Sequence, residues 1–251
     1  MASGVRKVVA ITRRELVAYF SSPLAYIVMT AFLLMQGYIF YLIVSYLNNP
    51  MTQAMAPLQL FFGGTIFFWL FLLFLVPVIT MRLIAEERRS GTIEVLLTSP
   101  VTEGQVIVGK FLAAFAFYLA LWLPTLAYVF ILRQHATIDL LPVAAGYVGV
   151  AALGVLFLGV GTFASTLTNN QLIAAIIAFA AMVLLFSIGL VEQLLVSSSA
   201  IKAALGQMNL WTQMDDYAKG IVDTRHVVYE LSVGILFLFL AIKSLEVKKW
   251  R

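Results

Sequence analysis

Long apolar runs alternate with short polar segments along nearly the whole chain. Six of these runs are long enough to cross a hydrocarbon core of roughly 30 Å, which takes about 20 residues of α-helix. They lie near residues 24–46, 58–80, 111–132, 141–165, 172–191 and 227–245. The runs are continuous and lack the two-residue period of barrel strands, so they predict helices and exclude a β-barrel. We therefore expect an all-α, polytopic membrane protein in which residues 1–251 form one transmembrane domain.

The composition supports this interpretation and removes several other classes of protein. Hydrophobic residues make up 62% of the chain and charged residues 11%, which is more apolar surface than a soluble domain of this length can bury. The chain has no cysteine, which excludes disulfides, thiolate metal sites and thiol catalysis. The first apolar run begins only near Leu24 and is too long for a signal peptide, so we expect it to remain as an anchor.

The distribution of basic residues predicts the orientation, because cytoplasmic segments keep Lys and Arg. Twelve of the 16 basic residues precede the first span, separate the second from the third, or follow the last. They are Arg6, Lys7, Arg13, Arg14, Arg82, Arg88, Arg89, Lys110, Lys243, Lys248, Lys249 and Arg251. We expect both termini to be cytoplasmic in a bacterial inner membrane. The net charge of +4 then reflects topology and not nucleic-acid binding.

An amphipathic helix is predicted before the first span, over residues 5–20. Its apolar side carries Val5, Val8, Val9, Leu16 and Phe20, and its polar side carries Arg6, Lys7, Arg13 and Arg14. Ser21 and Ser22 end this helix, and Pro23 is well placed to begin the next. Two interpretations remain open: a basic flank that only sets the topology, or a lever beside a partner protein.

The longest polar interruption, residues 82–102, has the features of a docking segment. Gly91 is expected to break the helix that precedes it, and Thr92 can cap a short helix over residues 93–98. In that helix Ile93, Leu96 and Leu97 form an apolar patch suited to a shallow groove on another protein. The alternative is a loop lying on lipid headgroups. Further on, Thr102 and Gln105 have capping-box spacing for the helix that enters the third span.

Four motifs carry a resemblance to a known family. They are EERRSGTIEVLLTSPVT at residues 86–102, STLTNNQLIAA at 165–175, KGIVDTRHVVYELS at 219–232 and SLEVKKW at 244–250. The chain resembles the permease subunits of type-2 ATP-binding-cassette (ABC-2) exporters, closest to the gliding-motility and nitrous-oxide-maturation types. In such permeases the first polar segment forms a coupling helix that sits in a cleft of a cytoplasmic ATPase.

The resemblance also implies roles for individual residues and a set of partners. The coupling motif matches Glu86, Glu87, Gly91, Thr92, Glu94, Leu97 and Pro100, and a second cytoplasmic turn matches Asn169, Asn170 and Gln171. The implied partners are a cytoplasmic ABC ATPase, a second copy of this chain or a related permease, the lipid bilayer and an auxiliary membrane protein with an external domain. The implied function is ATP-driven export. The alternative is a scaffold without transport that couples an ATPase to a periplasmic machine.

Two motifs suggest nucleotide or metal binding, but each lacks residues that such a site needs. Residues 104–110 read GQVIVGK like a P-loop, but Phe111 follows where Mg²⁺ binding needs Ser or Thr. We expect no nucleotide site, no catalytic residues and no cofactor here, with ATP and Mg²⁺ bound by the partner ATPase. His226 and Glu230 are four residues apart, but two ligands make an incomplete metal site, so we expect a solvated helix start there and no metal.

An ion-coupled carrier usually keeps a charged residue near the bilayer midplane. None of the six predicted spans is expected to place one there, and Gln36 is among the few polar residues at that depth. The predicted spans therefore argue against an ion-coupled carrier. Small residues recur in the fourth and fifth spans, and serve either packing within one subunit or a dimer seam. They are Ala145, Gly149, Gly154, Gly159, Gly161, Ser165, Ala174 and Ala178.

The outer loop, residues 197–225, shows helical periodicity. Its apolar residues recur at steps of three or four and predict amphipathic helices lying on the membrane or on a partner. They are Ile201, Leu205, Met208, Trp211, Met214, Tyr217 and Ile221. We expect this loop to act as a lid or a partner contact.

Overall fold

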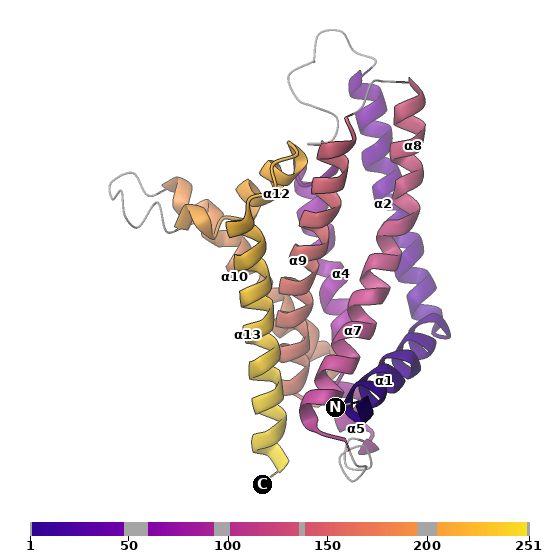
Figure 1. Cartoon of the computed structure of the whole chain (residues 1–251), viewed down its shortest axis with the longest axis vertical. Coiled ribbons are helices and arrows are strands. Elements are labelled where there is room, and N and C mark those ends of the chain that lie inside the picture. Colours follow the sequence, from indigo (N-terminus) through magenta and orange to yellow (C-terminus); the bar gives the residue numbers. More distant parts are fainter. Residues whose placement is uncertain (1, 48–59, 93–100, 136–138, 195–204, 250–251) are drawn as a thin grey trace.

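The computed structural model describes residues 2–47, 60–92, 101–135, 139–194 and 205–249. Within these ranges every regular element is a helix, which confirms the all-α fold. The helices are α1 Ala2–Phe20, α2 Pro23–Leu47, α4 Ile66–Thr80, α5 Ala85–Arg89, α7 Glu103–Trp122, η1 Leu123–Thr125, α8 Leu126–His135, α9 Leu140–Leu167, α10 Gln171–Leu194, α12 Leu210–Ala218 and α13 Thr224–Lys249. Figure 1 shows a bundle of long helices, with α1 lying obliquely at one end and α12 near the other.

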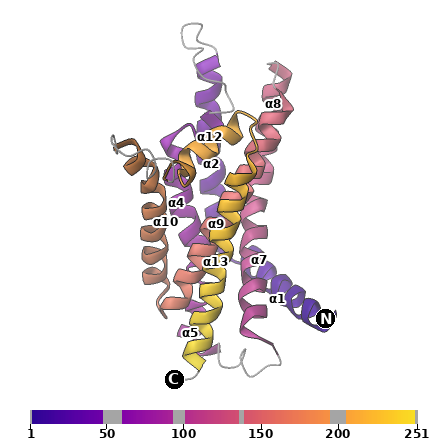
Figure 2. The same ribbon diagram turned by 60° about the vertical axis from the view of Figure 1, so that its left-hand side comes forward.

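Six helical segments in the described part of the chain are long and apolar enough to cross a membrane. They are Pro23–Ser45, Ile66–Arg89, Glu103–Gln134, Leu140–Leu167, Gln171–Glu192 and Thr224–Val247. The chain is therefore a multi-pass membrane protein. Both ends of the chain lie at the end of the bundle that carries α5 (Figures 1 and 2), as an even number of spans requires.

Two spans differ in their limits from the expected ones, for local reasons. In the run predicted from residue 58 the long helix α4 begins only at Ile66, because a turn in which Gly63 has a φ of 95° precedes it. The span predicted from residue 111 starts earlier, because Thr102 caps a helix beginning at Glu103. The predicted capping box of Thr102 and Gln105 is thus confirmed, and residues 104–110 belong to a helix and not to a phosphate-binding loop. Pro124 lies in the short 3₁₀ turn that separates α7 from α8.

Helix α9 is the centre of the bundle: 72% of its span is buried, and it contacts α4, α7, α10, α12 and α13. Its glycines permit these contacts. A Cβ on Gly154 would lie 2.4 Å from the Tyr118 ring, one on Gly159 would lie 2.7 Å from the Gly234 carbonyl oxygen, and one on Gly161 would lie 2.2 Å from the Thr80 hydroxyl. These glycines therefore serve packing within one subunit, the first of the two interpretations left open by the sequence.

Substituting Gly159 by Ala is expected to destabilise the fold, because the new methyl group would meet backbone atoms of α13 that cannot rotate away. Overpacking of this kind typically costs about 1–3 kcal/mol. The matched control is Gly104→Ala, where the nearest atom to a Cβ is the Ile242 methyl at 3.8 Å. Thermal unfolding in detergent should show a lower Tm for Gly159→Ala alone. Equal Tm values for the two variants would contradict the close α9–α13 contact.

Candidate functional site

The polar segment after α4 is fixed to α9 by a single serine. The backbone N–H groups of Ile84 and Ala85 each donate to the Ser165 hydroxyl oxygen at 3.1 Å, and this hydroxyl donates to the Met81 carbonyl at 3.2 Å. The first N–H groups of any helix lack partners within that helix. Ser165 supplies partners for the start of α5 and so holds α5 against the end of α9.

A second bond ties α5 to the same end of α9. The half-buried Arg88 guanidinium donates to the carbonyl oxygen of Thr166. The α9–α10 turn follows directly, and in it the Asn170 side chain accepts hydrogen bonds from the N–H groups of Leu172 and Ile173 at 2.9 and 3.4 Å. Asn169, Asn170 and Gln171 therefore lie near α5, which contacts both α9 and α10. The two predicted cytoplasmic segments are neighbours in space.

A buried lysine joins α5 to α1 and α7. Lys110 Nζ lies 2.9 Å from Glu87 Oε1 and 3.2 Å from Glu15 Oε1, and the Lys110 side chain is only 2% exposed. Arg14 Nη2 lies 2.7 Å from Glu15 and 3.3 Å from Glu87. We call Arg14, Glu15, Glu87 and Lys110 the ionic cluster. Its two positive and two negative charges balance, as a buried charge requires.

The charge of Glu15 is expected to make the docking of α1 dependent on pH. Burial alone raises the pKa of this carboxyl group, but Lys110 and Arg14 outweigh burial and hold its pKa below the ordinary value of 4.5. A group with a lowered pKa stabilises the folded state above its ordinary pKa, and this contribution is lost as the pH falls through the lowered value.

We therefore expect α1 to stay on α7 at neutral pH and to loosen as the pH falls through the lowered pKa of Glu15, below the ordinary value of 4.5. Hydrogen-exchange protection factors of the α1 amides, corrected for the intrinsic rate at each pH, measure this change. Glu15→Gln is the control, because an amide does not titrate in this range and α1 should then respond less to pH. The same response in both proteins would remove Glu15 as the cause.

Further contacts fix α1 to the bundle. The Tyr19 ring stacks on Phe117 at 5.0 Å, and its hydroxyl donates to the Ile79 carbonyl at 2.8 Å. Burial raises the pKa of Tyr19, so this hydroxyl keeps its proton. The Arg82 guanidinium lies over the same ring at 4.9 Å and donates to the Ser22 hydroxyl at 3.1 Å. The start of the polar segment is therefore bound to α1, through Tyr19, and to Ser22, which lies two residues after the end of α1.

The helical wheel predicted for residues 5–20 placed Val5, Val8, Val9, Leu16 and Phe20 on one side and did not include Ile11 and Tyr19. In the structure Ile11 and Tyr19 are buried against the bundle, while Val5 and Val9 are 65% and 59% exposed. The packed face follows the crossing of α1 over Gly109, where a Cβ would lie 2.8 Å from Ile11. Helix α1 thus has one apolar face against α7 and a second, outward one.

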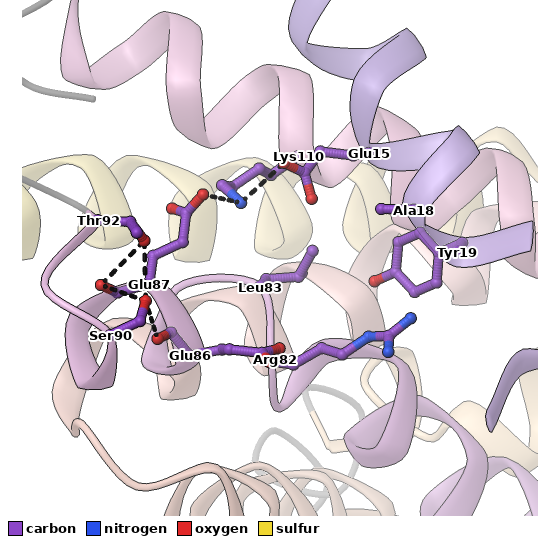
Figure 3. A pocket seen from close by; sticks show the side chains of 10 residues that line it. All are labelled: Glu15, Ala18, Tyr19, Arg82, Leu83, Glu86, Glu87, Ser90, Thr92 and Lys110. Carbon is purple, nitrogen blue, oxygen red and sulfur yellow. Dashed lines mark hydrogen bonds and ion pairs between the residues drawn. The ribbon is translucent and has the colours of Figure 1, made fainter. Parts of the chain in front are cut away.

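Beside the ionic cluster lies a cavity of ≈ 300 Å³, which we call the α1–α5 cavity. Figure 3 shows its side chains: Glu15, Ala18, Tyr19, Arg82, Leu83, Glu86, Glu87, Ser90, Thr92 and Lys110. At its rim the hydroxyl oxygens of Ser90 and Thr92 lie 2.9 Å apart, and Gly91 reverses the chain with a φ of 71°. The predicted break at Gly91 is confirmed. Glu94, Leu97, Pro100 and the short helix predicted over residues 93–98 lie outside the described residues.

The sequence did not assign a binding role to most of the residues that hold this site together. Glu15 and Tyr19 belonged to no recognised motif, and Arg82 served only as a marker of orientation. Ser165 was named only as a small residue at the start of the 165–175 motif, and Lys110 only as a marker of orientation and as the last residue of GQVIVGK. One signal was available for Lys110, because a capping box at Thr102 starts the helix at Glu103 and so places this lysine two turns inside it. A lysine at such a depth is expected to be paired.

At the opposite end of the bundle, the expectation of a solvated start for the last span is wrong. Glu230 is 1% exposed and accepts a hydrogen bond from the Tyr217 hydroxyl at 3.2 Å, so the span predicted over residues 227–245 does contain a buried carboxyl group, one turn from its start. The reason is that α12 packs on α9 and places Tyr217 over Gly149. His226 Nε2 lies 3.9 Å from Asp216, and the described residues hold no group of three or more His, Cys, Asp or Glu suited to a metal.

The α12 segment of the outer loop is amphipathic, as its periodicity predicts, and its apolar side lies on the bundle. Leu210, Met214 and Tyr217 are buried in contacts with α9 and α10. Asn209 caps this helix and donates to Glu192 on α10 at 2.7 Å. The loop therefore covers its own subunit in the described range, and its role as a lid or a partner contact stays a prediction.

Six apolar spans define a multi-pass membrane protein, and at one end of its bundle a polar segment is fixed between α1 and the central span α9. The family model described as "ABC-2 family transporter protein" matches residues 52–214, more than half of the chain. The chain belongs to this family and is the permease component of an ABC transporter. Membership implies a partner ATPase. A comparison with curated proteins gave no significant match.

Proposed function

We propose that this chain is the membrane-spanning subunit of an ATP-driven exporter in a bacterial inner membrane, and that residues 82–102 receive the movement of a cytoplasmic ATPase. The observation that carries the proposal is the attachment of α5 to three other helices: Ser165 on α9, Lys110 on α7 and, through Lys110, Glu15 on α1. The motifs at residues 86–102 and 219–232 favour the gliding-motility and nitrous-oxide-maturation types.

These attachments define which helices would move when the ATPase displaces residues 82–102. Closure of the ATPase on ATP binding would displace residues 93–100, which are joined to α5 by Ser90, Gly91 and Thr92. Because Ser165 and Arg88 bind α5 to the end of α9, the displacement would reach the most buried span of the bundle. The Glu87–Lys110 pair would carry it to α7 at the same time. ATP and Mg²⁺ would be bound by the ATPase, and two permease subunits, identical or related, would form the pathway.

Affinity purification of the tagged chain from its native membrane, followed by mass spectrometry, tests the proposal. We expect a soluble ABC ATPase in stoichiometric amount, together with a second permease copy or a related permease. Recovery of the chain without any ATPase, under conditions that keep known transporter complexes intact, would contradict it. An ATPase accompanied by a periplasmic machine, with no transport in proteoliposomes, would favour the scaffold alternative.

A further inference from the structure

The α1–α5 cavity is rich in groups that accept hydrogen bonds. Glu87 uses its Oε1 atom for both Lys110 and Arg14, while its Oε2 atom is buried and has no hydrogen-bond partner. The Glu86 side chain lines the same cavity and forms no ion pair with a described residue. The hydroxyl groups of Ser90 and Thr92 lie at its rim. A buried carboxylate oxygen without a partner is rare in folded proteins and calls for an explanation.

The cations that line the cavity are already engaged elsewhere. Lys110 lies between Glu15 and Glu87, and Arg82 binds the Ser22 hydroxyl and the face of Tyr19. Arg14, at the edge of the ionic cluster, contacts the two carboxylates that Lys110 also contacts. None of the three is paired with Glu86. The cavity therefore offers the charge of Glu86 and an open oxygen of Glu87 to an incoming donor.

We propose that the α1–α5 cavity receives a basic side chain, arginine or lysine, from the partner ATPase. The inference rests on the proposed function, which places an ATPase against residues 82–102. A volume of ≈ 300 Å³ has room for a whole side chain, and Ser90 and Thr92, which line the cavity, belong to the segment 82–102 to which the proposed function assigns the ATPase contact. A guanidinium group matches this lining, since its fork of N–H donors pairs with carboxylates in two directions at once.

A metal ion fits the same cavity less well. No group of three His, Cys, Asp or Glu side chains with metal-binding geometry occurs in the described part of the chain. The Lys110 ammonium also lies 2.9 Å from Glu87, and would repel a divalent ion placed at the other oxygen of that carboxylate. A guanidinium group carries a single charge spread over several N–H donors, so the Lys110 ammonium would repel it less than it would repel a divalent ion.

Occupation of the cavity would link ATPase docking to α1. The incoming cation would share Glu87 with Lys110 and Arg14, so it would compete for the carboxylate that ties α5 to α1 and α7. The cavity would thus form a second contact with the ATPase, separate from the apolar patch predicted at Ile93, Leu96 and Leu97, and binding there would change how firmly α1 is held.

The test uses the natural absence of cysteine from this chain. A single cysteine at Ala18, which lines the cavity, is labelled with a benzophenone maleimide, and the chain is illuminated in membranes with its co-purifying ATPase. Mass spectrometry then identifies the crosslinked peptide. In parallel, ATPase affinity is measured for Glu86→Gln and Glu86→Arg. The matched controls are Glu246→Gln and Glu246→Arg, which alter an exposed carboxylate on α13, at the same end of the bundle.

We expect a crosslink to an ATPase peptide that contains Arg or Lys, and a loss of affinity of roughly 10-fold or more for Glu86→Gln, the size of one charge-assisted hydrogen bond. Glu86→Arg should lose more, and replacing the crosslinked basic residue by Glu should restore its binding. The Glu246 variants should bind normally. Crosslinks that reach only lipid or this chain, with normal binding by both Glu86 variants, would overturn the inference and leave the proposed function standing. A wild-type chain that binds no ATPase would overturn both.

Discussion

Replacing Lys110 by Met is expected to release α1 from the bundle and to lower its stability more than any other single change of charge at this end. The side chain is 2% exposed and stands between Glu15 and Glu87, so its loss leaves two carboxylates with only Arg14 beside them, and Arg14 is 55% exposed. Breaking a buried ion pair by removing one partner costs about 3–5 kcal/mol. Methionine keeps most of the apolar, unbranched stem of the side chain and lacks only its last atom, so the loss of charge is the main change.

Two measurements check this expectation. Thermal unfolding in detergent reports overall stability, and the rate at which maleimide modifies a cysteine placed at the buried Ile11 reports the docking of α1 on α7. Both should change strongly in Lys110→Met. The matched control is Lys243→Met, since Lys243 forms an ion pair with Glu246 in which both side chains are exposed, and such pairs contribute only about 0–1 kcal/mol. Equal effects of the two substitutions would show that burial of the ionic cluster is not what holds α1.

Adding Glu15→Gln to Lys110→Met separates the loss of a bond from the burial of an unpaired charge. The second substitution removes one of the two carboxylates that Lys110 neutralised. If the unpaired charges cause the damage, the double variant should be more stable than Lys110→Met alone. If Lys110 only fills space between the helices, adding Glu15→Gln should not raise the stability above that of Lys110→Met.

The parts of the fold that could be predicted are those that depend on neighbours in the sequence. Apolar runs of sufficient length gave the spans, because a helix in lipid must satisfy its backbone within itself. Thr102 and Gln105 gave the start of α7, because a capping box needs only residues three apart. Gly91 gave the end of the first polar helix, because a positive φ is easily reached by glycine alone.

The parts that could not be predicted depend on contacts between distant segments. Ser165 meets Ile84 across 81 residues, and nothing in the sequence around either marks the pair. The wheel of residues 5–20 contains apolar residues on two faces, and only the crossing with α7 decides which of them are covered. Glu230 has the sequence of a solvated helix start, and only the packing of α12 buries it.

The same contacts bear on the two interpretations of the N-terminal helix. A basic flank that only sets topology would need no specific bonds to the rest of the protein. Instead, Glu15 lies 3.2 Å from Lys110 and Arg14 lies 3.3 Å from Glu87, so α1 is bonded to the base of the docking segment and to α7. A displacement of α5 would therefore act on α1, which favours the lever.

Introducing aspartate at Leu97 is expected to abolish productive contact with the ATPase while the permease still inserts and folds. Leu97 belongs to the apolar patch predicted from its spacing with Ile93 and Leu96, and the family resemblance places it in the coupling motif. A charge at the centre of an apolar contact must be desolvated without a partner. The loss should reach that of an interface hot spot, about 2 kcal/mol or more, which weakens binding roughly 30-fold.

Co-purification of the ATPase and the stimulation of its activity by the permease in proteoliposomes measure this loss, and thermal unfolding of the permease alone shows that the fold is intact. Val95→Asp is the matched control, because in a helix over residues 93–98 this position points away from the patch. We expect Val95→Asp to bind nearly as the wild type does. If Leu97→Asp binds the ATPase normally, the docking segment is not the contact. If Leu97→Asp and Val95→Asp lose ATPase binding equally, residues 93–98 do not present the patch as a helix. The ATPase must then act on the bundle through α5 itself.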